Sequence, residues 1–107
     1  METEARVVLC TVPTGDIAAQ IARELVQRRL AACVNVIPGI TSVYRWKGSI
    51  TTDAEQLLVI KTSSSLMDSL QQAIQELHPY ELPEIIAVPI VGGLPAYLAW
   101  INECTKP

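Results

Sequence analysis

The chain has 107 residues, of which 50% are hydrophobic and 18% are charged, with a formal net charge of −3. A chain of this length buries roughly two thirds of its unfolded surface, enough for one core, so we treat residues 1–107 as a single domain. The net negative charge argues against a surface that binds nucleic acid or anionic membranes by general electrostatic attraction. No run approaches the ~20 apolar residues that cross a bilayer. Because a basic leader is also missing, we expect a cytoplasmic protein.

The first elements predicted along the chain are a strand and a helix. Residues 7–12 are a continuous apolar run, which is typical of a strand buried on both faces. Residues 13–16 break this run and begin a helix, for which Thr14 is the expected N-cap. An apolar stripe with a spacing of four residues carries the helix to about Arg29.

The longest strand pattern covers residues 32–46 and is interrupted once, at Pro38-Gly39. A turn at residues 47–49 leads into a second strand from about residue 51 to residue 62. Strands usually run about 3–10 residues, and a proline within one belongs at an edge or a bulge. A long apolar edge promotes aggregation unless something covers it, so we expect another copy of the chain to do so.

The remainder of the chain predicts a helix, a strand and a final helix. Residues 63–65 with Asp68 resemble a capping box, and the helix behind them should end at His78-Pro79. Residues 84–91 predict an edge strand, and Pro95 suits the first turn of a terminal helix. The order β-α-β-β-α-β plus a helix predicts an α+β, ferredoxin-like antiparallel sheet whose first and third strands are central.

Three segments carry a family resemblance: AACVNVIPGITSVYRWKG at residues 31–48, IKT at 60–62 and HPYELPEI at 78–85. They resemble the CutA family of divalent-cation tolerance proteins, and the likeness extends from Val7 to Ile101. The resemblance implies a homotrimer with the architecture of the PII signalling proteins. It also implies an association with copper and other divalent metals, and no organic cofactor.

Cys10 and His78 are the predicted metal ligands, since a thiolate and an imidazole suit copper and, after it, zinc. The resemblance places Cys10 at a ligand position and His78 at the second of two adjacent histidines. Leu77 stands where the first would be. Two ligands make a weak site, so tight binding would need water, Glu81, Glu84 or groups from a neighbouring subunit. Alternatively, Cys10 is a small core residue and His78 caps a helix.

A second group combines aromatic and charged side chains that would suit a ligand cleft. Its members are Tyr44, Trp46, Lys61, Tyr80, Glu81 and Glu84. In a PII-like trimer, clefts between subunits could hold a small ligand on such residues. Alternatively, the aromatic residues seal the interface between subunits, where Trp and Tyr are enriched.

Enzyme motifs are missing: there is one histidine and no GxSxG, HExxH or P-loop pattern. We therefore expect a non-enzymatic homotrimer that binds divalent metal, copper first, and contributes to metal tolerance. The alternative is a PII-like signalling or assembly trimer that binds a small ligand between subunits. The sequence identifies no other protein partner.

Overall fold

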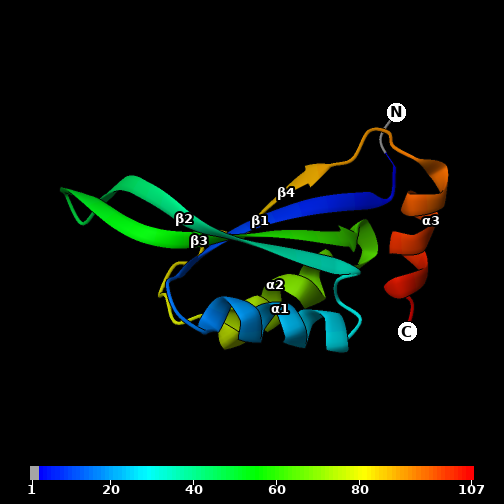
Figure 1. The fold of residues 1–107 in the computed structure, drawn as a ribbon, viewed down its shortest axis with the longest axis horizontal. Helices are drawn as coiled ribbons and strands as arrows, with labels where there is room; N and C mark the ends of the chain where they lie inside the picture. The colour runs from blue at the N-terminus through cyan, green and yellow to red at the C-terminus, as the bar shows by residue number, and fades with distance from the viewer. Residues whose placement is uncertain (1–2) are drawn as a thin grey trace.

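The computed structural model describes residues 3–107, and its elements follow the expected order (Figure 1). The elements are β1 (Ala5–Pro13), α1 (Ile17–Gln27), β2 (Cys33–Trp46), β3 (Ser49–Ser63), a 3-10 turn (Ser64–Leu66), α2 (Met67–Leu77), β4 (Ile86–Pro89) and α3 (Pro95–Cys104). Within residues 3–107, no helix is long and apolar enough to cross a membrane.

The four strands form one antiparallel sheet in the order β2-β3-β1-β4. The first and third strands are therefore central, which confirms the predicted ferredoxin-like arrangement. Helices α1 and α2 lie together on one face of the sheet, and α3 lies at one end of it (Figure 1). The fold is α+β.

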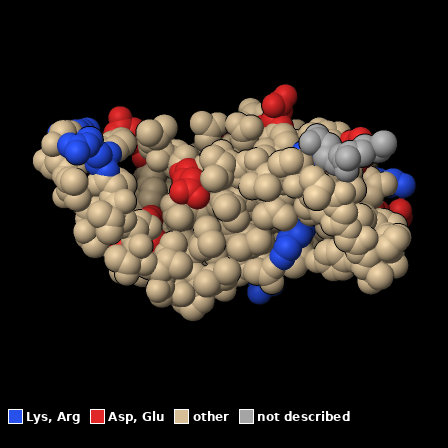
Figure 2. Space-filling view, turned by 90° about the horizontal axis from the view of Figure 1, so that it is seen from above, with Lys and Arg blue, Asp and Glu red and all other residues tan. Residues whose placement is uncertain are grey.

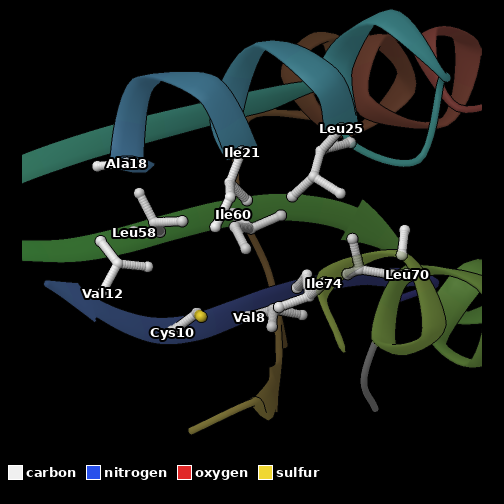
Figure 3. Close-up of a cluster of buried hydrophobic side chains, with 12 residues drawn as sticks. Val8, Cys10, Val12, Ala18, Ile21, Leu25, Leu58, Ile60, Leu70 and Ile74 are labelled. Carbon is white, nitrogen blue, oxygen red and sulfur yellow. The ribbon is translucent and has the colours of Figure 1, made fainter. Parts of the chain in front are cut away.

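The main core lies between the sheet and the two helices. Alternate residues of β1 and β3 point toward α1 and α2, because side chains alternate across a strand. Figure 3 shows these strand residues meeting the inward residues of both helices. The fully buried set includes Val8, Cys10, Val12, Ile21, Leu25, Leu58, Ile60, Leu70 and Ile74.

The other face of the sheet is apolar but uncovered in the single chain. Leu9 is paired with Val59 on one side and with Ile86 on the other, and residues directly opposite each other share a face. We call this surface the open face; its apolar members are Val7, Leu9, Ile37, Leu57, Val59, Ile86 and Val88. Figure 2 shows that few charged residues lie on this side of the molecule. The prediction that β1 is buried on both faces is therefore wrong for one chain, since only the helix side is covered.

Both predicted helix caps are wrong. Gly15 turns the backbone with a φ of +104°, so α1 begins at Ile17 with Asp16, rather than Thr14, in the N-cap position. Before α2, the Ser63 hydroxyl hydrogen-bonds the Thr105 hydroxyl at 2.7 Å. Within the described part of the chain, no side-chain hydrogen bond caps the start of α1 or α2, so the expected local caps do not form.

Prolines mark the remaining boundaries as expected. Helix α2 ends at Leu77, and His78 before Pro79 is extended. Strand β4 ends at Pro89 on the sheet edge, although it is shorter than residues 84–91. In β2, the pairing with β3 shifts between Ile37 and Ile40, which confirms an irregularity at Pro38-Gly39.

Beyond this irregularity, β2 and β3 continue as a two-stranded arm (Figure 1). The last pair between β1 and β3 is Pro13 with Glu55, whereas β2 and β3 remain paired as far as Trp46 with Ser49. We call residues 40–54 the distal hairpin. No other strand that the structure describes pairs with the distal hairpin, so its side is free to form one wall of a hollow.

Candidate functional site

A cleft of about 710 Å³ lies between the distal hairpin and the segment that follows α2. Its walls are residues 42–46, residues 79–82, Glu84, Glu55 and Thr11. Figure 2 shows the molecule hollowed beside the hairpin, with acidic residues around the hollow. The cleft forms within a single chain, and the predicted clefts between subunits stay a prediction.

Five of the six predicted cleft residues line this space: Tyr44, Trp46, Tyr80, Glu81 and Glu84. The sixth, Lys61, does not. Its ammonium group donates a hydrogen bond to the side-chain oxygen of Asn35, on the neighbouring strand β2. The strand register separates Lys61 from the cleft, because Lys61 pairs with Val7 near the opposite end of β1.

Among the cleft residues that sequence reasoning missed, Glu55 is the buried acidic one. It is only 4% exposed, and its Oε2 accepts a hydrogen bond from the Tyr80 hydroxyl at 2.7 Å. Burial and this carboxylate raise the pKa of Tyr80 above its usual range, so the phenol keeps its proton. The available signal was alternation: Glu55 shares the strand face of Leu57 and Val59, where an acidic residue breaks an apolar series.

Tyr44 makes a similar but exposed contact on the distal hairpin. Its hydroxyl donates a hydrogen bond to the carboxylate of Asp53, and this bond raises the pKa of Tyr44. Both phenol hydroxyls near the cleft therefore donate their only hydrogen bond to a carboxylate. Their oxygens remain hydrogen-bond acceptors.

Cys10 lies in the core beneath the helices rather than in the cleft (Figure 3). Burial raises the pKa of its thiol to about 12, and the negative charges of Glu84 and Glu55 act in the same direction. The thiol is therefore protonated at neutral pH. Since metals bind the thiolate, this position does not present a ligand as it stands.

His78 is 7% exposed, and both of its ring nitrogens are already used. Nδ1 accepts the backbone N–H of Tyr80 at 3.1 Å, so the ring proton is on Nε2, which donates to the Thr11 carbonyl at 2.7 Å. The ring thus fastens the segment after α2 to β1. Leu77, which stands where the resemblance would place the first of two histidines, packs against the core.

Cys10 and His78 therefore do not fit a metal ion in this conformation. Among residues 3–107, no three His, Cys, Asp or Glu side chains gather in a group that could hold one. The prediction that these two residues are ligands stays a prediction, and it requires the thiol to ionise and the imidazole to leave its partners.

A family model for the CutA1 divalent ion tolerance protein matches residues 6–104. This chain belongs to the CutA1 family. The family model and several relatives carry names of divalent-cation tolerance proteins, which agrees with the expected role in metal tolerance and gives no indication of catalysis.

Named relatives of this CutA1 chain come from distant organisms. It is 50% identical over 99 residues to the divalent-cation tolerance protein CutA of Thermus thermophilus, covering 92% of this chain and 96% of that protein. It is also 50% identical over 96 residues to Protein CutA of Mus musculus, covering 90% of this chain but only 54% of the mouse protein. The crystal structure of CutA from Xylella fastidiosa superposes with a TM-score of 0.94 at 44% identity, covering 97% of this chain and 100% of that one.

The buried thiol predicts a pH dependence for the stability of this CutA1 chain. The folded pKa of Cys10 is raised from 9.0 to about 12, so above about pH 9 the unfolded chain loses a proton that the folded chain keeps. The contribution of Cys10 to stability is fully present below about pH 9. Above that pH, the free energy of unfolding falls by up to about 1.4 kcal/mol per pH unit. Urea unfolding from about pH 8 to about pH 10 measures this fall.

The matched control is Cys10→Ala, which removes the titrating group. Its free energy of unfolding should fall less steeply than that of the wild type over the same pH range. Parallel slopes in the two proteins would show that the Cys10 thiol does not cause the pH dependence.

Proposed function

We propose that this CutA1 chain acts in divalent-cation tolerance as a homotrimer that binds a divalent metal ion, copper before zinc, and catalyses no reaction. The open face carries the homotrimer part of the proposal, and the family's association with divalent-ion tolerance supports the metal part. Antiparallel sheets that face water usually alternate apolar and polar residues, whereas in this sheet the open face is also mostly apolar, with Thr11, Asn35, Glu55 and Lys61 as its polar members.

Self-association would cover the open face. Soluble monomers rarely expose a large contiguous apolar surface, and Ile37, Ile86 and Val88 are each well exposed in the single chain. The sheet also has two unpaired edges, β2 and β4. Identical copies related by closed symmetry can bury both features, and the family resemblance implies three copies.

The metal site in this proposal depends on the assembly. Glu81 and Glu84 are exposed at the cleft, and we propose that they bind the ion together with groups from a neighbouring subunit. Carboxylates take the place of the thiolate and imidazole here, so the preference for copper rests on the general order of affinities, in which a given site binds Cu(II) more tightly than Zn(II).

Calorimetric titration with Cu(II) and Zn(II) tests this metal site. The double variant Glu81→Gln/Glu84→Gln should bind Cu(II) at least about tenfold more weakly than the wild type, a loss of ~1.4 kcal/mol. Cys10→Ala should bind like the wild type. The reverse pattern would assign the ion to the Cys10–His78 pair, and no binding to the wild type would refute metal binding altogether.

A second candidate function is a trimer that binds a small organic ligand in its clefts, as in a PII-like signalling or assembly protein. It is favoured by one observation, the cleft of about 710 Å³ that contains five of the predicted residues. Small-molecule sites usually occupy ~300–1,000 Å³ and combine apolar walls with a few polar groups.

A further inference from the structure

We propose that the cleft binds an organic ammonium ion, meaning an amine or quaternary ammonium group attached to an apolar body. This inference rests on the second candidate function and names its ligand class. It does not require metal binding, because the walls of the cleft come from one chain, but it shares Glu81 and Glu84 with the proposed metal site.

The first argument is charge. Glu55, Glu81 and Glu84 line the cleft, and Arg45 is the one cationic residue among the described lining residues. Glu55 is almost completely buried, so water screens its charge less than that of a surface carboxylate. The lining therefore favours a positive ligand.

The second argument is the direction of the hydrogen bonds. The Tyr80 hydroxyl donates to Glu55 and the Tyr44 hydroxyl donates to Asp53. Each phenol has a single proton, so both oxygens can only accept a further hydrogen bond. Together with the carboxylates, they provide acceptors for the N–H groups of a protonated amine.

The third argument is the aromatic wall. The Lys47 ammonium lies 5.8 Å from the centroid of the Trp46 ring, so this indole already accepts a cation from its own chain. The Tyr80 ring packs against His78 with their centroids 4.7 Å apart, which holds it in place at the cleft. Cations are stabilised over such rings, most strongly over Trp.

The size and lining of the cleft favour an organic cation over a bare metal ion. Its volume suits a small molecule, and Val43 and Leu82 supply apolar contacts. In the part of the chain that the structure describes, no three His, Cys, Asp or Glu side chains converge on a point that could hold a metal ion. An ammonium ion needs no such convergence, because acceptors and ring faces can surround it at longer range.

Fluorescence titration of chelator-treated protein tests the inference. The chain has two tryptophans, so Trp100→Phe leaves Trp46 as the only indole reporter. The probes are benzyltrimethylammonium and its anionic counterpart, phenylacetate. The cation should change the Trp46 emission saturably with a Kd below ~1 mM, and phenylacetate should not.

Two matched pairs of variants locate the binding. Tyr44→Ser should weaken cation binding at least about tenfold, whereas Tyr97→Ser on α3 should not; these tyrosines are 40% and 42% exposed. Glu84→Gln should weaken it, whereas Glu103→Gln, the same charge change on α3, should not.

Equal binding of phenylacetate, an unsaturable response, or a Tyr44→Ser variant that binds like its control would each overturn the inference. Sedimentation and Cu(II) titration of the same samples report on the proposed function separately. A trimer that binds copper but no ammonium probe would refute the ligand assignment alone.

Discussion

Val59→Asp should convert the assembled protein into monomer or aggregate. Val59 lies in the middle of the open face, paired with Leu9 on β1 and Asn35 on β2. Burying an unpaired carboxylate between subunits costs several kcal/mol for each copy. Sedimentation velocity should show loss of the trimer, and the midpoint of thermal unfolding should fall by more than ~10 °C.

Val26→Asp provides the matched control. Val26 is an exposed valine that lies on α1, outside the open face. This variant should sediment like the wild type. If Val59→Asp also remains assembled, the open face is not the surface through which the copies associate.

Tyr80→Phe should lower the free energy of unfolding by about 1.5–3 kcal/mol, the usual contribution of a hydrogen bond to a charged group. The change removes the phenol that donates to Glu55 and leaves a buried carboxylate without this partner. The ring remains, so packing against His78 is preserved. Chemical unfolding at neutral pH measures the difference.

Tyr44→Phe is the control for this prediction. It removes the same kind of bond, from a phenol to a carboxylate, but the bond to Asp53 is exposed to water. Its cost should be clearly smaller than that of Tyr80→Phe, because water competes for the exposed partners and screens their interaction. Equal losses of unfolding free energy in the two variants would contradict the view that the Tyr80–Glu55 bond contributes more because Glu55 is buried.

The sequence predicted the fold well where local chemistry decides it. Pro79 ends α2 because the residue before a proline avoids the helical region, and Pro38-Gly39 disturbs the β2 pairing as expected. The continuous apolar runs of residues 7–12 and 57–60 mark the two central strands. These features depend on neighbours in sequence, which the sequence displays directly.

The candidate site was harder to predict because its contacts join distant residues. Tyr80 and Glu55 are 25 positions apart, and His78 and Thr11 are 67 apart. The residue types alone made Cys10 and His78 good ligands, whereas the fold buries the thiol and uses both imidazole nitrogens. The predicted capping box before α2 failed for the same reason, since α2 begins at Met67 without a side-chain cap and Ser63 bonds to the distant Thr105.

The central claim is that copies of the chain bury the open face in a trimer. Native mass spectrometry of freshly purified protein tests this claim most directly. We predict a particle of three copies of the 11.7 kDa chain. A stable single copy at low micromolar concentration would contradict the account.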